Sequence, residues 1–234
     1  MQLAWLAPDA APDAFPPVAA ALRDPPGLLC AGGDLSPARL LLAYQRAIFP
    51  WYSAGDPILW WSPDPRTAIF PDELHRSRSL RRTLGAGRLR CSADRAFEAV
   101  VAGCAGPRRG ADGTWITPAM GEAYRALHAL GHAHSIECWA DGKLVGGLYG
   151  VMVGSAFCGE SMFSRAPDAS KVALVALASH LRAGGGTLID CQLPSPHLAR
   201  LGARPVHRAE LLEQLARPAP ALAVARWELA GPAP

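Results

Sequence analysis

The 234-residue sequence contains only two lysines, and its six cysteines never form a C-x-x-C pair. A structural zinc site is therefore not indicated, and we expect no metal. No stretch approaches the roughly 18 to 20 uninterrupted apolar residues of a membrane helix, and the first residues lack the basic and apolar regions of a secretory signal. We therefore expect a cytoplasmic protein whose thiols are reduced.

Hydrophobic residues make up 50% of the chain and charged residues 18%, which excludes disorder as the main state. Since domains hold roughly 150 residues on average, the length allows one large domain or two unequal ones. An aromatic and turn-rich passage at residues 58–66 predicts the boundary. We expect a small N-terminal α/β domain over residues 1–64 and a larger domain over residues 65–234.

Most of the 23 basic residues are arginines, and they are unevenly placed. The stretch 75–90 has no Asp or Glu but holds six of them: Arg76, Arg78, Arg81, Arg82, Arg88 and Arg90. Such a run favours a polyanionic partner. A solvated helix face in an arginine-rich protein is the alternative, and composition does not choose between the two.

Apolar spacing and capping residues predict helices over residues 38–47, 77–84, 94–104 and 117–130. Extended patterns predict strands at residues 135–139, 144–153, 156–163 and 187–193. A further helix begins at Asp168 or Ser170 and ends at the glycines 184–186. The chain is thus expected to be α+β, with a mostly antiparallel sheet flanked by helices.

This element order resembles the core of GNAT-like acyltransferases. The glycine-rich loop that would hold the pyrophosphate of coenzyme A is absent, because residues 164–171 read S-R-A-P-D-A-S-K. An enzyme that uses acetyl-CoA is therefore disfavoured.

Several residues could carry chemistry by themselves. Ser161 lacks the second glycine of a G-x-S-x-G elbow, because Phe163 stands there. Cys191 could act as a thiol nucleophile with His197, but a cysteine inside an apolar strand more often serves packing. His132 and His134 could bind a metal, yet no carboxylate or cysteine motif stands near them, which favours a structural pair.

Asp190 and Gln192 are two residues apart on an expected strand, so alternation places them on one face and Cys191 on the other. A buried Asp needs a hydrogen-bond partner, and the neighbouring amide could supply one. Chemistry alone leaves open whether this is a structural pair or a reactive one.

The most specific features are long strings that stand in order along the chain. They are GGDLSP at 32–37, IFPW at 48–51, GDPILWWSPDPR at 55–66, LHRSRS at 74–79, GTWIT at 113–117, LGHAHS at 130–135, GGLYG at 146–150, GESMFS at 159–164 and LIDCQ at 188–192. Together they closely resemble the leucyl/phenylalanyl-tRNA–protein transferases. One departure is Ala47, where the family usually has Gly; a positive φ at this position would strain an alanine.

The resemblance implies an aminoacyltransferase that moves Leu or Phe, and in some cases Met, from charged tRNA to the N-terminal Lys or Arg of a protein, marking it for degradation. It implies Asp190 and Gln192 as the catalytic pair and Glu160 as the group that holds the aminoacyl ammonium. The matching aminoacyl pocket is Leu148, Met162, Leu174 and Ile189; Trp51 and Trp115 match the residues that cover the terminal adenosine. The tRNA phosphates would then meet Arg66, Arg76, Arg78, Arg81 and Arg82.

The ester of a charged tRNA is already activated, so the enzyme needs no cofactor and only has to align the amine. We expect the Gln192 carbonyl, polarised by Asp190, to orient that amine, with true proton abstraction as the less favoured mechanism. The larger domain would be GNAT-like and the protein a monomer. Two alternatives stay open: a related transferase with a non-protein acceptor, and a non-catalytic tRNA-binding module.

Overall fold

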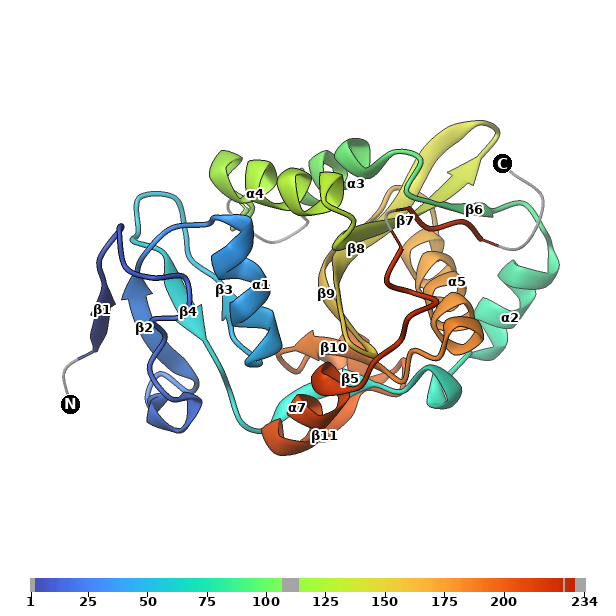
Figure 1. Cartoon of the computed structure of the whole chain (residues 1–234). Coiled ribbons are helices and arrows are strands. Elements are labelled where there is room, and N and C mark those ends of the chain that lie inside the picture. The colour runs from blue at the N-terminus through green and yellow to red at the C-terminus, as the bar shows by residue number, and fades with distance from the viewer. Residues whose placement is uncertain (1–2, 107–113, 225, 230–234) are drawn as a thin grey trace.

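The computed structural model describes residues 3–106, 114–224 and 226–229, so Gly113 of the GTWIT string lies outside it. Residues 4–61 form a four-stranded sheet in the order β1-β2-β4-β3 (Figure 1). Its strands are β1 (Ala4–Leu6), β2 (Leu28–Gly32), β3 (Phe49–Pro50) and β4 (Leu59–Trp61).

The rest of the chain builds a seven-stranded sheet in the order β11-β5-β10-β9-β8-β7-β6. The strands are β5 (Arg66–Ile69), β6 (Arg90–Ala93), β7 (Ala133–Ala140), β8 (Lys143–Val153), β9 (Ala156–Ser164), β10 (Leu188–Gln192) and β11 (Arg204–Val206). The expected meander is confirmed, since β7, β8 and β9 pair antiparallel in sequence. Strand β10 instead runs parallel to β9 and antiparallel to β5. Strands β5, β6 and β11 were not expected from the sequence pattern.

The helices are α1 (Pro37–Gln45), α2 (Arg78–Gly85), α3 (Phe97–Ala105), α4 (Pro118–Ala129), α5 (Ala169–Gly184), α6 (Pro196–Ala199) and α7 (Arg208–Ala216), with short 3₁₀ turns at Val18–Ala20 and Pro71–Glu73. Helices α1 and α4 begin as their sequences predict: a proline occupies the first turn, and the Ser36 or Thr117 hydroxyl accepts a backbone N–H bond.

Helix α3 begins three residues later than expected, at Phe97 in place of Asp94. Asp94 adopts a left-handed conformation with φ 54°, which cannot continue a helix. The Glu137 carboxylate accepts the N–H groups of Arg95 and Ala96 and so satisfies the free donors at this end.

Helices cover both faces of the larger sheet: α3 and α4 lie on one face and α5 on the other (Figure 1). The first face shares its core with the N-terminal sheet, because Trp60, Tyr44, Phe97, Leu127 and Tyr149 belong to one buried cluster. Burying a side chain of this size typically contributes about 1.5 to 3 kcal/mol. The two sheets are therefore joined by a continuous apolar layer.

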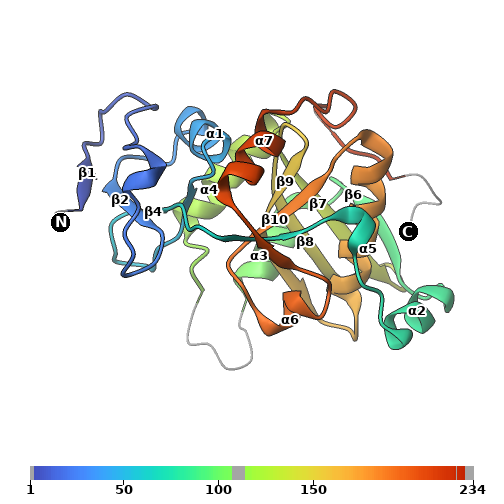
Figure 2. The same cartoon turned by 90° about the horizontal axis from the view of Figure 1, so that it is seen from below.

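The turned view places the N-terminal sheet at one end of the molecule and α2 at the other (Figure 2). Strands β9 and β10 lie between them (Figures 1 and 2). No helix in the described part of the chain is long and apolar enough to cross a membrane.

Candidate active site

The parallel pairing of β9 with β10 ends at the partners Cys158 and Asp190, and the polar residues that follow face one another. Gln192 donates its side-chain amide to Glu160 Oε1 at 2.9 Å. A bulge between Asp190 and Gln192 and a φ of 60° at Gln192 turn this amide toward Glu160. The left-handed conformation costs a non-glycine residue roughly 1 to 2 kcal/mol. Its side-chain position is thus decided by the bulge and not by strand alternation.

Asp190 points the other way, so the expectation that Asp190 and Gln192 share a face is wrong. Ile189 and Cys191 line a cavity, whereas Asp190 is fully buried against Arg66. Asp190 reaches Gln192 only through the backbone, accepting the Gln192 N–H at 2.9 Å. It therefore holds the bulge in place and does not polarise the Gln192 side chain.

Arg66 binds Asp190 through two hydrogen bonds, Nε to Oδ1 at 3.1 Å and Nη2 to Oδ2 at 2.9 Å. Its Nη1 donates to the Ala47 carbonyl at 2.9 Å, and the residue is 1% exposed. A guanidinium that is buried in this way cannot contact a phosphate of the tRNA. The structure therefore does not support the expectation that Arg66 binds tRNA. Ala47 itself adopts φ 57°, the strained conformation that an alanine tolerates poorly.

Glu160 receives hydrogen bonds from three elements. Tyr44 of α1 donates at 2.7 Å, Tyr124 of α4 at 2.5 Å, and Gln192 of β10 at 2.9 Å. Burial raises the pKa of Glu160 to about 7, although the two tyrosine hydrogen bonds and that of Gln192 act to lower it. Burial and the Glu160 charge raise the pKa values of both tyrosines well above the usual range. The carboxyl group therefore changes charge near neutral pH, while both phenols stay protonated.

Neither tyrosine was among the site residues expected from the sequence. Each is a phenol on a helix face that is otherwise buried and apolar. A buried phenol usually finds a hydrogen-bond partner. This was the available signal, but it did not name Glu160 as the partner.

A cavity of about 230 Å³ lies beside Glu160 and Gln192. All four residues of the expected aminoacyl pocket line it, from three strands and a helix: Leu148, Met162, Leu174 and Ile189. Since a cavity of about 150 Å³ can hold benzene, this one has room for a leucyl or benzyl side chain. An apolar hollow and a hydrogen-bonding pair therefore adjoin.

The two expected adenosine-binding tryptophans are not among the cavity-lining residues. Trp51 is 40% exposed at the end of β3, where its ring packs on Trp61 at 5.5 Å. Trp115 is partly buried against the core cluster that includes Tyr44 and Tyr124. Trp115 thus packs against the same core as the tyrosines that hold Glu160, whereas Trp51 lies at the surface beside β4.

The arginines around α2 border two surface grooves. One, of about 730 Å³, is lined by Arg82, Arg88, Arg90 and Trp139. The other, of about 480 Å³, is lined by Arg76, Arg81 and Arg182 together with the acidic Asp72 and Glu73. Arg78, Arg81 and Arg82 are exposed and Arg76 partly so, so their cations are available to an anionic partner.

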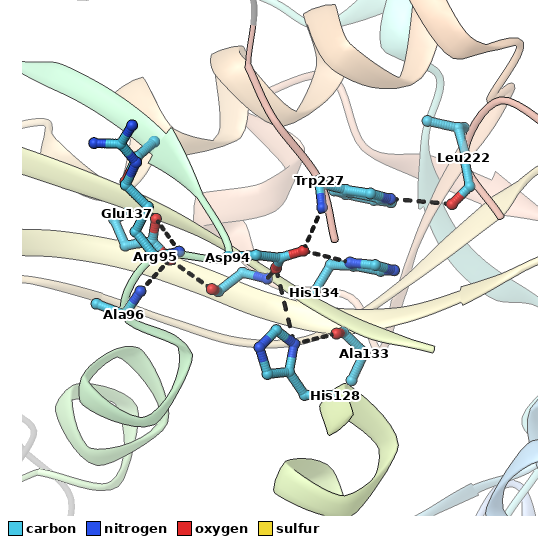
Figure 3. Close-up of polar contacts among 11 residues, drawn as sticks. Asp94, Arg95, Ala96, His128, Ala133, His134, Glu137, Leu222 and Trp227 are labelled. Carbon is cyan, nitrogen blue, oxygen red and sulfur yellow. Dashed lines mark hydrogen bonds and ion pairs between the residues drawn. The ribbon is translucent and has the colours of Figure 1, made fainter. Parts of the chain in front are cut away.

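A second buried polar cluster surrounds Asp94 and holds the C-terminal segment (Figure 3). His134 donates through Nδ1 to Asp94 Oδ2 at 2.7 Å, and the Trp227 N–H donates to the same oxygen at 2.7 Å. The Trp227 indole stacks on His134 with ring centroids 4.0 Å apart. His134 is therefore a structural residue, and the described residues contain no group of three side chains placed to hold a metal.

Cys191 lines the cavity, but burial raises the pKa of its thiol far above the usual range, so it is not poised as a nucleophile. Ser161 and His197 also line the cavity.

Comparison with known proteins decides the family. The family model of the leucyl/phenylalanyl-tRNA protein transferases matches residues 68–216, and the model of their N-terminal domain matches residues 33–64. This chain belongs to that family. A transferase of this name from Stutzerimonas stutzeri is 58% identical over 92% of this chain and 94% of its own length. One from Pseudomonas aeruginosa is 57% identical over 87% and 90%, and one from Aromatoleum aromaticum 56% identical over 98% and 92%.

Solved structures resemble this family member more distantly. A GCN5-related N-acetyltransferase from Kribbella flavida aligns with a TM-score of 0.37 at 11% identity, covering 70% of this chain and 58% of its own. The structure of L-PGS from Bacillus licheniformis aligns with a TM-score of 0.40 at 12% identity, covering 71% and 53%. Scores at this level carry no conclusion about fold or function.

Proposed function

We propose that this chain transfers Leu or Phe, and in some cases Met, from charged tRNA to the N-terminal Lys or Arg of acceptor proteins, which creates an N-terminal degradation signal. One observation carries the proposal beyond family membership: an apolar cavity of about 230 Å³ adjoins Glu160 and Gln192. The cavity would hold the aminoacyl side chain while the two polar groups meet the amines. The reaction would take place in the cytoplasm, and the protein would act as a monomer.

The reaction requires a free α-amine to attack the ester carbonyl of the charged tRNA. Gln192 gives an N–H to Glu160, so its carbonyl oxygen is the end of the amide left to accept a hydrogen bond from the acceptor's amine. Glu160 thus fixes the direction of the Gln192 amide, a role that was expected of Asp190. Gln192 orients the amine, and Asp190 holds the backbone that carries Gln192.

Glu160 would also receive the ammonium group of the residue being transferred. An ammonium beside a carboxylate favours the ionised form, which lowers the pKa of Glu160 from its value of about 7 in the free protein. Two tyrosine donors hold the carboxylate in position. Because the ester is already activated, the reaction needs no metal or organic cofactor.

The aminoacyl pocket would select by shape. Met162 is unbranched and adaptable, which suits a cavity that accepts both an isobutyl and a benzyl group. A single missing methylene gives only about 10- to 200-fold discrimination, so rejection of β-branched residues depends on steric fit near Leu148, Leu174 and Ile189.

The tRNA would contact two distant parts of the molecule. Exposed arginines on and before α2, Arg76, Arg78, Arg81 and Arg82, would neutralise phosphates at one end. Trp51 and Trp115 would stack on the terminal adenosine nearer the N-terminal sheet, where stacking contributes about 1 to 3 kcal/mol per base. We omit Arg66 from this set and assign it to positioning Asp190.

We also propose that residues 1–64 and 65–234 form two domains, because each range contains one of the two sheets.

The test incubates the full chain with radiolabelled Leu-tRNA and a peptide that begins with Arg, and follows the label. Label on the peptide N-terminus is expected. Label on a non-protein acceptor would favour the first alternative, and protection of the ester without transfer would favour a tRNA-binding module. Gln192→Ala and Gln192→Glu should lower turnover by on the order of 100-fold, because the amine loses its orientation. Gln45→Ala, at an exposed amide on α1, is the matched control. Near-normal turnover of Gln192→Ala would refute the role of Gln192.

A further inference from the structure

Two cysteines face each other across the strand pair at the open edge of the larger sheet. Cys91 of β6 is the direct partner of Cys138 of β7. In the same register, Asp94 pairs with Ser135, and the Asp94 N–H donates to the Ser135 carbonyl. Hydrogen-bonded and non-hydrogen-bonded pairs alternate along an antiparallel ladder. Cys91 and Cys138 therefore occupy a non-hydrogen-bonded pair, the type whose Cα atoms lie about 4.5 Å apart and whose side chains come closest.

This spacing falls within the range of about 4.4 to 6.8 Å that disulfides require between Cα atoms. The interaction of the two side chains raises the pKa of Cys91 and lowers the pKa of Cys138. The register therefore places the two cysteines where one disulfide can join them.

The position also allows a small oxidant to reach the pair. Strand β6 is the last strand of the sheet order (Figure 1). Cys91 is partly exposed, while Cys138 is fully buried. The cysteines Cys30, Cys104 and Cys158 are buried as well. Cys191, also partly exposed, pairs with no cysteine and lines the cavity. Cys91 and Cys138 are thus two thiols that face each other directly, and one of them is partly exposed to solvent.

We propose that Cys91 and Cys138 form a reversible cross-strand disulfide when the protein meets hydrogen peroxide. A thiolate sulfur attacks the peroxide, forming an S–O bond and breaking the O–O bond to release hydroxide, which becomes water. The second sulfur then attacks the sulfenic acid, forming the S–S bond and expelling the oxygen as water with the second thiol proton. Two thiols are oxidised and one peroxide is reduced to two waters, and the product is the same whichever sulfur reacts first.

The link would close a long loop of the chain. Between Cys91 and Cys138 lie α3 and α4, the two helices that cover one face of the sheet. Joining distant residues restricts the unfolded chain more than the folded one. Oxidation is therefore expected to raise the unfolding temperature of the native protein. The proposal does not depend on the transferase activity.

The experiment treats the full chain with hydrogen peroxide, blocks free thiols with an alkylating agent under denaturing conditions, and maps the digest by mass spectrometry. We expect linked peptides containing Cys91 and Cys138, lighter than the two reduced peptides by two hydrogen atoms, which dithiothreitol separates again. The oxidised protein should melt roughly 5 to 10 °C higher than the reduced protein.

Two cysteine variants test whether the link and the rise in melting temperature depend on Cys91. Cys91→Ser should lose both the linked peptide and the rise in melting temperature, whereas Cys30→Ala, at a buried cysteine of β2, should keep both. Alkylation of both Cys91 and Cys138 after peroxide treatment would overturn the proposal. Irreversible oxidation of Cys91 with Cys138 still alkylated, or a link from either to Cys191, would also overturn it.

Discussion

At the scale of single residues, the site is organised around one carboxyl group. Glu160 accepts hydrogen bonds from Tyr44, Tyr124 and Gln192, which come from two helices and a strand. Burial keeps its pKa near 7, so pH controls whether it carries the charge that an ammonium group needs. A second charge, that of Asp190, is neutralised by Arg66 and stays out of the cavity.

The kcat/KM for transfer should rise with pH through about 7, because only the ionised form of Glu160 in the free protein can bind the aminoacyl ammonium. We call this rise the acid limb of the pH profile. In Glu160→Gln, we expect kcat/KM to fall by about 10- to 100-fold and the acid limb to disappear, so that only the ionisation of the acceptor's amine still changes the rate with pH. Tyr44→Phe is the matched variant: it removes a hydrogen bond that lowers the pKa of Glu160, so the limb should move to higher pH. An unchanged pH limb in Glu160→Gln would contradict the assignment.

The Arg66–Asp190 pair should matter to stability far more than a surface pair. Arg66→Met leaves a buried carboxylate without its partner, which typically costs about 3 to 5 kcal/mol. Arg204→Ala breaks the exposed pair with Glu73 and should cost less than about 1 kcal/mol. Urea unfolding of the two variants makes the comparison. Equal losses in the free energy of unfolding would show that the buried pair contributes no more to stability than the exposed pair.

At the scale of elements, the end of β10 decides which side chains reach the cavity. Regular alternation would put Gln192 on the face of Asp190, and the bulge opposite Thr67 turns it instead toward Glu160. Helix α2 contributes differently, because its arginines extend from an exposed helix at the far end of the molecule (Figure 2).

The arginines of α2 should determine the salt dependence of tRNA binding. Each phosphate contact adds roughly 0.7 to 0.9 to the slope of log affinity against log salt concentration. In the double variant Arg78→Ala/Arg81→Ala we therefore expect the slope to become shallower by about 1.4 to 1.8. Arg217→Ala, at an exposed arginine after α7, should leave it unchanged. Titrations of tRNA binding at several salt concentrations measure this, and an unaltered slope in the double variant would remove α2 from the interface.

At the scale of the whole molecule, the C-terminal segment closes the second face of the larger sheet. Trp227 is 1% exposed and stacks on His134 (Figure 3). Its ring centroid also lies 4.6 Å from that of His180 on α5. Residues far apart in the sequence thus complete one core, together with Leu222 and Leu181.

Trp227→Ala should lower the free energy of unfolding by about 3 to 5 kcal/mol, because it leaves a large cavity against His134 and His180. Trp5→Ala, at an indole that is 66% exposed, should change it by no more than about 0.5 kcal/mol. Chemical denaturation of both variants tests the difference. A loss below 1 kcal/mol in Trp227→Ala would mean that the segment adds little to the fold.

Local sequence patterns predicted helices α1 to α5, the strand meander and the family, but not helices α6 and α7. Caps such as Ser36 and Thr117 and the apolar spacing are local, and local patterns decide where an element begins and which face is buried. The family resemblance also named four of the residues that line the cavity.

The partners of the charged groups depend on the tertiary structure. Arg66 and Asp190 are 124 positions apart, and Tyr44 and Glu160 are 116 apart, so no local pattern joins them. Their meeting depends on strand order, on the bulge at Gln192 and on the packing of α1 and α4 over the sheet. A burial pattern reports that a polar side chain needs a partner, but the identity of that partner depends on which elements the fold brings into contact.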